Sequence, residues 1–316
     1  MEAFEDLYRI LGTKFEFYFL ESQMAPIGEK IVRENIGKVF EESDGAIVFK
    51  AEKYDSKLHT RVFITSTGLP TYETKELGLT KEKFNTKPDM NLNIVVTANE
   101  QMDYMRVVAK ALSLIHPEYG SKMKHITHGM MRFSKNSSGK MSSRTGFIVG
   151  AEDLIKQLKE KTETEEIAIG AIKYMILHQA IGGDIIFDLE KSVSTEGDSG
   201  VYLQYAHARA NSVIEKAKKE NILPDFEVLP DEITEVEKLL YRFPEIVLRS
   251  ASEYEPHYIA NYLIELARAY NSFYGNTVIV KKEDKTSSYK VALTFAFTFV
   301  MKKGLYLLGI QAPEKM

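Results

Sequence analysis

The spacing of hydrophobic positions divides this chain into an alternating first part and an almost wholly helical second part. Within the first part, Asn91–Thr97 is a β-branched run, and apolar residues then recur at helical spacing through Gln101–Ile115. A strand, a short turn and a helix in this order predict one βα unit of a parallel sheet. We therefore expect an α/β fold over the first part of the chain.

Helical periodicity dominates from about residue 150 onward. It predicts helices at Asp153–Lys161, Ile167–Ala180, Gly200–Glu220, Thr234–Ser252 and Pro256–Tyr274. The stretch Leu293–Phe299 alternates like a strand, so its periodicity leaves helix and strand open. The predicted organisation is an α/β domain at 1–194 followed by an all-α domain at 195–316.

Composition narrows the class of protein. The 316 residues are 44% hydrophobic and 27% charged, which is ordinary for a soluble globular protein long enough for two buried cores. The absence of cysteine excludes disulfides, thiolate metal sites and a cysteine nucleophile, and it fits a reducing cytoplasm. The first residues are acidic, unlike a signal peptide, and the longest apolar stretch, Val291–Met301, is too short for a bilayer. The net charge of −4 does not decide for or against RNA, because binding depends on local basic patches.

The run Gly139–Gly146 places Lys140 and Arg144 among serine and threonine hydroxyls, between glycines. Cations and hydroxyl donors suit a polyphosphate, and the glycines allow the backbone to close over it. The run is not a Walker loop, in which Lys-Ser/Thr directly follows the second glycine. Taken alone, this composition is also typical of a solvated surface loop.

The predicted helix Gly200–Glu220 has two distinct sides. One flank carries Tyr202, Tyr205, Arg209 and Lys216. Aromatic rings beside cations suit the unstacked bases of single-stranded RNA, whereas the alternative is tyrosines that pack against a neighbouring helix. The apolar stripe beside this flank consists of Leu203, Ala206, Ala210, Ile214 and Ala217.

The run Gly139–Gly146 resembles the KMSKS loop of class I aminoacyl-tRNA synthetases, in a variant common in arginyl-tRNA synthetases. Further segments resemble arginyl-tRNA synthetase in the expected order, including Gly68–Leu77, Glu196–Arg209 and Leu308–Met316. The HIGH signature of the family is absent; His125–His128 has similar letters but lies too close to the lysine-serine loop. The chain therefore resembles the C-terminal portion of an arginyl-tRNA synthetase without the HIGH-containing N-terminal half.

This resemblance implies both a fold and a function. The fold is the second half of a class I Rossmann-like catalytic domain followed by a helical-bundle anticodon-binding domain. The activity is arginine–tRNA ligation, in which arginine is activated with ATP to arginyl-adenylate and transferred to tRNA(Arg). The resemblance implies that Mg²⁺ accompanies ATP and that the protein itself binds no metal. It also implies a cytoplasmic protein that does not associate with a membrane and whose partner is the missing N-terminal half. The alternative is a non-catalytic tRNA-binding protein derived from a synthetase.

The resemblance also assigns roles at the nucleotide end of the site. Lys140, Ser142 and Arg144 are expected to be catalytic, because they would neutralise the pyrophosphate leaving group. Ser143 stands where the general signature has its second lysine, and Thr145 stands where the arginine family often has another lysine. The residues expected to bind ATP are His128, Gly129, Met130, Lys140 and Met141.

Substrate arginine is expected to contact Tyr72, Glu76 and Gln101. Tyr72 and Glu76 are four residues apart and would face one side of a helix, where a phenol and a carboxylate suit a guanidinium group. Glu76 stands where the family usually has aspartate. Gln101 follows a strand at the carboxyl edge of a parallel sheet, where such folds bind ligands. Surface or helix-capping roles are the alternatives for all three.

By the same resemblance, the residues expected to bind tRNA are Tyr202, Tyr205, Arg209, Tyr274 and Met316. Tyr274 also continues the core stripe of the helix Pro256–Tyr274, so burial is the alternative there. Asp184 and Asp188 have no histidine at ligand spacing and are interpreted as solvated loop residues.

Overall fold

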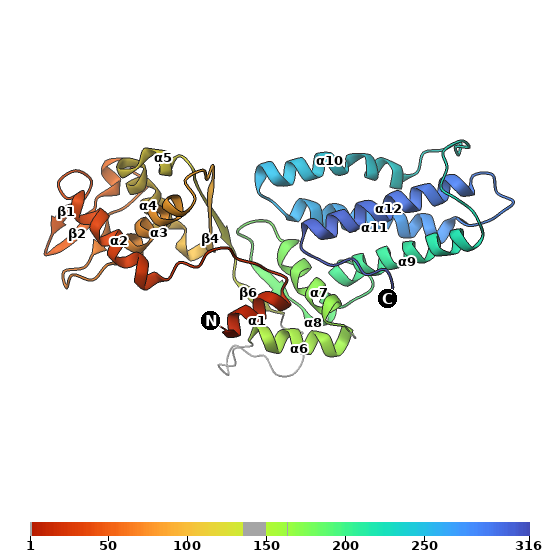
Figure 1. Ribbon diagram of the computed structural model, residues 1–316, viewed down its shortest axis with the longest axis horizontal. Coiled ribbons are helices and arrows are strands. Elements are labelled where there is room, and N and C mark those ends of the chain that lie inside the picture. The colour runs from red at the N-terminus through yellow and green to blue at the C-terminus, as the bar shows by residue number, and fades with distance from the viewer. Residues whose placement is uncertain (1, 135–149, 163) are drawn as a thin grey trace. The chain divides into compact units, whose positions relative to one another are not determined.

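The computed structural model of the protein describes residues 2–134, 150–162 and 164–316. The chain forms two compact units, one comprising Phe15–Met130 and the other Met1–Lys14 with Met131–Met316 (Figure 1). Within the described ranges, no helix combines the length and apolar character that crossing a membrane requires.

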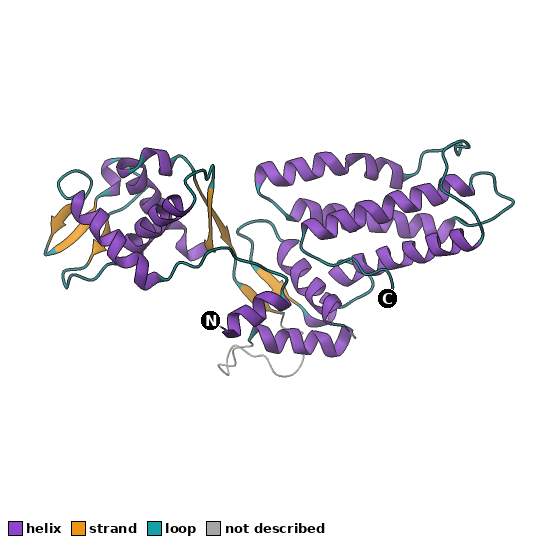
Figure 2. Ribbon diagram, in the orientation of Figure 1, coloured by secondary structure: helices purple, strands orange, loops and turns teal. Residues whose placement is uncertain are grey.

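Helices and two small sheets make up the unit Phe15–Met130 (Figure 2). The strands β1, β2 and β3 form an antiparallel sheet, while β4 and β5 pair in parallel. Its core includes the fully buried rings of Phe40, Phe49 and Phe63. The elements are α2 (Glu21–Glu34), β1 (Glu41–Ser43), β2 (Ala46–Phe49), the 3-10 helix η1 (Ala51–Lys53), β3 (Arg61–Ile64), α3 (Tyr72–Thr86), β4 (Asn93–Ala98), the 3-10 helix η2 (Asn99–Gln101), α4 (Met102–Ile115), α5 (Pro117–Gly120) and β5 (Met123–His128).

The predicted βα unit is confirmed by β4, η2 and α4. Helix α4 buries Met105, Val108 and Leu112, which are positions that the helical spacing selected. Strands β4 and β5 run parallel with Ala98 opposite His128, so their carboxyl ends meet at one edge. The predicted binding residues Gln101 and His128 belong to this edge, where parallel sheets bind ligands.

Two glycines allow α2 and α3 to approach each other closely. A Cβ atom at Gly28 would lie 1.9 Å from the carbonyl oxygen of Thr74, and one at Gly78 would lie 2.3 Å from that of Met24. No real Cβ atom tolerates such distances, so any other residue would force the helices apart. This contact fixes α3, the helix that carries two of the predicted arginine-binding residues.

The second unit is dominated by α9 to α12, which run alongside one another as a helical bundle (Figure 1). Its core includes Leu203, Leu263, Tyr270 and Phe297. Strands β6 and β7 pair in parallel. The elements are α1 (Glu2–Ile10), β6 (Met131–Phe133), α6 (Ala151–Thr162), α7 (Glu165–Leu177), β7 (Ile185–Phe187), α8 (Leu189–Ser192), α9 (Gly200–Lys219), α10 (Glu235–Glu253), α11 (His257–Asn276) and α12 (Ser287–Leu307).

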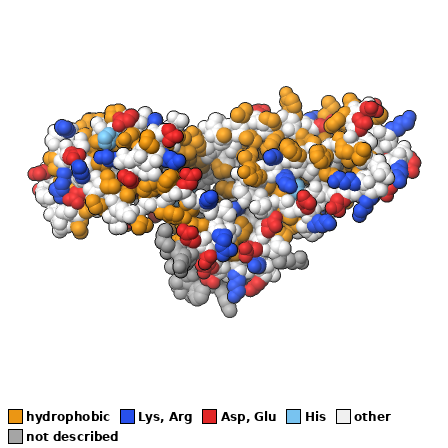
Figure 3. Space-filling model, viewed as in Figure 1, with side chains coloured by type: hydrophobic (Ala, Val, Ile, Leu, Met, Phe, Trp, Pro, Cys, Tyr) orange, Lys and Arg blue, Asp and Glu red, His pale blue; other side chains and the backbone are white. Residues whose placement is uncertain are grey.

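The helices predicted from periodicity are confirmed as α6, α7, α9, α10 and α11. The ambiguous stretch after them is also helical and lies inside α12. Leu293, Phe297 and Met301 are buried at helical spacing, whereas Phe295 and Phe299 face outward. The sequence alternates like a strand because exposed aromatic rings on the outer side of the helix add to the buried ones. Hydrophobic side chains accordingly lie among cationic ones on the surface of the bundle (Figure 3).

The second unit crosses the predicted domain boundary at residues 194/195. The reason is close packing between α7 and α9, because a Cβ atom at Gly200 would lie 2.5 Å from the carbonyl oxygen of Gly170. The elements before residue 195 thus join the bundle in one compact unit. The division into domains at 1–194 and 195–316 stays a prediction.

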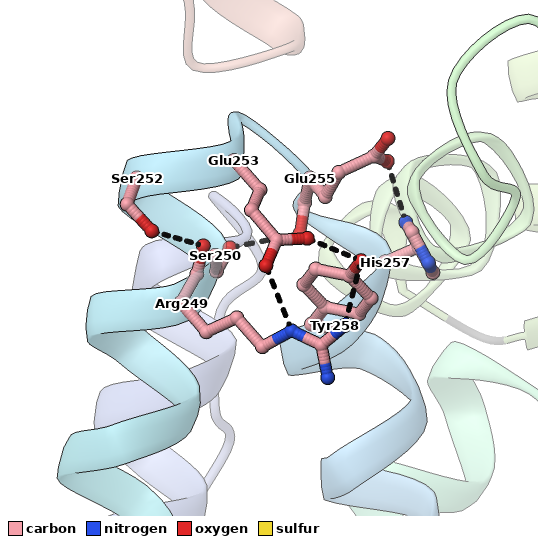
Figure 4. A network of polar contacts seen from close by, with 7 residues as sticks. All are labelled: Arg249, Ser250, Ser252, Glu253, Glu255, His257 and Tyr258. Atoms are coloured by element: carbon pink, nitrogen blue, oxygen red, sulfur yellow. Dashed lines mark hydrogen bonds and ion pairs between the residues drawn. The ribbon is translucent and has the colours of Figure 1, made fainter.

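A network of polar side chains surrounds the corner between α10 and α11 (Figure 4). The Arg249 guanidinium donates to Glu253 Oε1 at 3.0 Å, and the Tyr258 hydroxyl donates to Glu253 Oε2 at 2.6 Å. Beside them, His257 Nδ1 lies 2.8 Å from Glu255 Oε2. Arg249, Glu253 and Tyr258 face solvent, where ion pairs contribute little stability, so the network mainly shapes the corner.

Candidate functional site

The loop assigned to polyphosphate lies outside the described residues. This applies to Lys140, Met141, Ser142 and Arg144. Their roles in catalysis and in ATP binding therefore stay predictions that rest on the sequence.

Two predicted binding residues lie at the carboxyl edge of the β4–β5 pair. Gln101 ends η2 directly after β4, and His128 is the last residue of β5. The His128 Nδ1 atom lies 2.9 Å from the carbonyl oxygen of Gly129, which makes Nδ1 the donor because a carbonyl only accepts. The Met130 side chain beside them is exposed. The expected location of Gln101 at this edge is confirmed, while its contact with arginine stays a prediction.

Helix α3 places Tyr72 and Glu76 on one side, one turn apart. Tyr72 is 67% exposed, with the Lys75 ammonium 4.9 Å from its ring centroid. Glu76 is partly buried, and its Oε2 atom is enclosed without a hydrogen-bond partner among the described residues. Burial raises the pKa of the Glu76 carboxyl, and the Lys83 ammonium opposes this only in part. An enclosed carboxylate oxygen without a partner is costly, so it marks a position for a cationic donor.

Charged groups of both signs lie near Glu76. Burial raises the pKa of the Tyr104 hydroxyl on α4 to about 12, with further contributions from the carboxylates of Glu76 and Glu73. Glu73 is buried and has its own cation, since Arg61 Nη1 lies 3.3 Å from its Oε1 atom. The Lys83 ammonium donates to the side-chain oxygen of Asn93 at 3.3 Å, and it forms no ion pair with Glu76 within the described residues. Of Glu73 and Glu76, only Glu73 has a directly paired cation among the described residues, whereas Lys83 acts on Glu76 through its charge alone.

A separate pocket of about 650 Å³ in the second unit brings together Tyr205, Arg209, Tyr274 and Met316. The Arg209 guanidinium carbon lies 4.7 Å from the ring centroid of Tyr205 and 5.4 Å from that of Tyr274. At these distances the guanidinium attracts both ring faces, and this cation–π attraction holds the two rings around one charge. The Arg209 Nη1 atom also donates to the side-chain oxygen of Asn271 at 2.7 Å. The pocket therefore offers aromatic faces next to a fixed cation.

Tyr202 differs from its expected place on the exposed flank of α9. Its side chain is 9% exposed and belongs to the core that α9 shares with α10, α11 and α12. Its hydroxyl accepts from the Asn271 side-chain amide at 2.9 Å. The flank interpretation is wrong for Tyr202, because α11 covers this side of α9. The buried ring instead supports Asn271, which holds Arg209.

Part of the pocket wall comes from a segment that no sequence pattern indicated. The segment Thr277–Val280, which follows α11, lines the pocket together with Lys216 of the predicted flank. A β-branched run after a helix is visible in the sequence, but nothing in it indicates which helix the segment returns to. Its place depends on the packing of Ile279 against Val213 and Val291.

The described residues contain no group of three or more His, Cys, Asp and Glu side chains that could hold a metal ion. Asp188 accepts hydrogen bonds from the backbone amides of Glu190 and Lys191 and so caps α8. Asp184 lies 3.2 Å from an Arg132 guanidinium nitrogen. The solvated-loop interpretation fits Asp184, which is exposed in the loop before β7, whereas Asp188 is half-buried and serves as a helix cap.

Comparison with known proteins identifies relatives along the whole chain. Residues 15–169 match the family described as "tRNA synthetases class I (R), catalytic domain", and residues 203–316 match "DALR anticodon binding domain". The chain is 28% identical to an arginine–tRNA ligase of Porphyromonas gingivalis over 100% of its own length and 56% of the relative. It is 30% identical to one of Halothermothrix orenii, covering 100% of the chain and 58% of the relative.

Solved structures have the same fold. The arginyl-tRNA synthetase of Thermus thermophilus superposes with a TM-score of 0.81 at 24% identity, covering 99% of this chain and 62% of that one. A methionyl-tRNA synthetase of Mycobacterium tuberculosis gives 0.63 at 13% identity, covering 99% of this chain and 78% of that one. The chain spans about half the length of the curated relatives it matches. With both family matches in chain order, the protein belongs to the arginyl-tRNA synthetases, of which it contains part of the class I catalytic domain and the DALR domain.

Proposed function

We propose that this chain is part of an arginine–tRNA ligase. The enzyme activates arginine with ATP, accompanied by Mg²⁺, to arginyl-adenylate and then transfers the arginyl group to tRNA(Arg). The proposal extends to this chain the activity named for relatives of which it spans about half. The chain acts together with a polypeptide segment that corresponds to the rest of their length.

The single observation that carries the proposal is the enclosed Oε2 atom of Glu76. A guanidinium group presents planar N–H donors that match a carboxylate, and it is always charged at neutral pH. Its binding would give Oε2 the partner that it lacks among the described residues. The nearby Tyr104 hydroxyl, whose pKa is raised to about 12, stays neutral and can bond to the same group.

At the nucleotide end, the chain contributes charge and position. Lys140, with Ser142 and Arg144, would neutralise the negative charge that develops on pyrophosphate as it leaves. His128–Met130 would contact the adenine side, since they end and follow β5 at the carboxyl edge where parallel folds bind ligands. Each of these roles is a proposal from the family resemblance.

One face of the β4–β5 pair supports the proposed partner segment. Val95 is buried, whereas Ile94 is half-exposed and Val96 is 62% exposed on the opposite face. Parallel sheets occur almost only with both faces covered, and a two-stranded sheet is rarely stable alone. A segment that adds strands and helices here would bury these apolar side chains.

The pocket around Arg209 supports tRNA binding. Tyr205 and Tyr274 offer rings on which bases can stack, and Arg209 and Lys216 lie on the same wall for phosphate or base contacts. Met316 contributes an apolar surface to the same pocket.

Arginine-dependent exchange of pyrophosphate into ATP tests this function. We expect no exchange by the chain alone and exchange once the remaining segment of a related ligase is supplied. Lys140→Ala should then lower turnover much more than substrate binding. Robust exchange by the chain alone would contradict the partner requirement. Binding of tRNA without exchange, even with the segment present, would favour the alternative of a non-catalytic tRNA-binding protein.

A further inference from the structure

The segment Leu308–Met316, here called the tail, follows α12 without forming a helix or strand. A segment without helix or strand is poorly ordered unless other parts of the molecule hold it. Side chains of α7 and α9 donate hydrogen bonds to three alternate carbonyls of the tail. The contacts are Lys173 Nζ to Gly309 O at 2.5 Å, Gln204 Nε2 to Gln311 O at 3.0 Å and His207 Nδ1 to Pro313 O at 2.8 Å.

The two donors on α9 are deeply buried. Gln204 is 0% exposed and His207 is 1% exposed. Because a carbonyl only accepts, His207 Nδ1 carries the hydrogen, and Nε2 can accept from the Asn211 amide at 3.3 Å. The Gln204 Oε1 atom has no hydrogen-bond partner in the described part of the chain, so the amide is held there by its donor contact with the tail.

Helical spacing lets α9 serve two surfaces at once. Gln204 and His207 are three residues apart and face the tail, whereas Tyr205 and Arg209 are four apart and line the pocket. The tail then leads to Met316 on the pocket side. Met316 and Tyr205 line both this pocket and a smaller cleft of about 230 Å³. Together they form a wall that the pocket and the cleft share.

We propose that Gln204 and His207 are positioning residues that hold the tail so that Met316 completes the nucleotide pocket. The inference rests on the proposed function, since it concerns the pocket to which RNA binding is assigned. A thioether held on the wall that Met316 shares with Tyr205 would limit the space for a stacked base. Release of the tail would open the pocket into the neighbouring cleft and weaken the choice among bases, while phosphate contacts would persist.

The experiment follows Met316 directly by NMR of the 316-residue chain with isotope-labelled methionine methyl groups. Met316→Leu assigns the signal. In the wild type, we expect the Tyr205 ring to displace the Met316 methyl signal from its position in free methionine. The signal should return toward the free position in Gln204→Met and in His207→Leu. His207→Asn, which retains a donor near the site of Nδ1, should preserve it.

Thr298→Val is the matched control, because it removes a buried side-chain hydrogen bond in α12 that does not touch the tail. It should leave the Met316 signal unchanged. If the Met316 signal of the wild type lies at the position of free methionine, the proposal is overturned without the need for any variant. It is also overturned if the signal is unchanged in both Gln204→Met and His207→Leu.

RNA binding supplies the second measurement. Anticodon-arm hairpins that differ in one anticodon base are titrated, and the ratio of the tightest to the weakest affinity is compared. This ratio should fall roughly threefold to tenfold in Gln204→Met and His207→Leu, the size of a methionine–aromatic contact. An unchanged ratio despite a displaced Met316 signal would refute the role in base selection. Absence of RNA binding by the wild type would refute the proposed function, while the methyl signal would still decide whether these side chains hold the tail.

Discussion

Glu76→Gln is predicted to stabilise the protein while weakening its binding of arginine. The substitution keeps the shape of the side chain but removes the charge from an enclosed oxygen that has no partner among the described residues. Leaving a buried polar group unpaired costs about 1–3 kcal/mol. Because Glu76 is only partly buried, we expect about 1 kcal/mol, which corresponds to a rise of a few degrees in Tm.

The pH dependence of this gain follows from the direction of the pKa shift. Burial raises the pKa of Glu76 above its ordinary value of 4.5, so the fold favours the protonated form. The ionised carboxylate therefore costs stability at neutral pH, and this cost disappears as the pH falls through the raised pKa. The stability difference between Glu76→Gln and the wild type should be present at pH 7 and vanish in acid.

The affinity for arginine should fall in Glu76→Gln, although the stability of the protein rises. Removing one partner of a hydrogen-bonded charge pair costs roughly 2–3 kcal/mol, or roughly 30- to 150-fold in affinity. Wild-type affinity should rise with pH as Glu76 ionises, and Glu76→Gln should lose this dependence.

Thermal unfolding followed by circular dichroism and calorimetric titration with arginine measure the two effects, with and without the complementing segment. Glu34→Gln is the control, because it makes the same charge change at an exposed position on α2. A lower Tm for Glu76→Gln at pH 7, together with unchanged arginine affinity, would show that Glu76 neither costs stability nor binds arginine.

The remaining predictions concern packing and RNA. Gly78→Ala should destabilise the fold by about 1–3 kcal/mol in urea unfolding, because its Cβ atom would lie 2.3 Å from Met24 O; an unchanged midpoint would argue against this close approach. Tyr205→Ala should weaken RNA binding by roughly 1–3 kcal/mol in filter-binding titrations with a circular dichroism control, and equal affinity would assign the ring to protein packing. Tyr202→Phe, which removes a buried hydroxyl, should lower stability by about 1 kcal/mol and change RNA affinity less than Tyr205→Ala. Lys302→Ala should act weakly and mainly reduce the salt dependence of RNA binding.

Local patterns in the sequence were sufficient for most of the secondary structure. The β-branched run and the helical spacing after it specify β4 and α4, and the apolar stripe of α9 is buried as its periodicity requires. These elements are predictable because each buries a face whose period is written into a short window of residues. The motif resemblances likewise depend on local order along the chain, and they indicated the family.

Other features depended on neighbours that no local window contains. Tyr202 and Tyr205 have the same side chain on the same helix, yet α11 buries one and leaves the other beside Arg209. The alternating phenylalanines of α12 are helical because only one set meets the core. In each case the neighbouring helices decided which side chains of a helix are buried.

Local sequence patterns specified β4, α4 and the helices α6, α7 and α9 to α11, together with the side-chain chemistry that each carries. Which groups meet depended on the packing of separate elements. It left the Glu76 carboxylate oxygen enclosed without a partner within the described residues, gathered Tyr205, Arg209, Tyr274 and Met316 around one pocket, and brought alternate carbonyls of the tail to donors more than a hundred positions earlier in the chain. The physical reason is that periodicity specifies a buried face, whereas hydrogen-bond partners and pockets arise only when separate elements pack together.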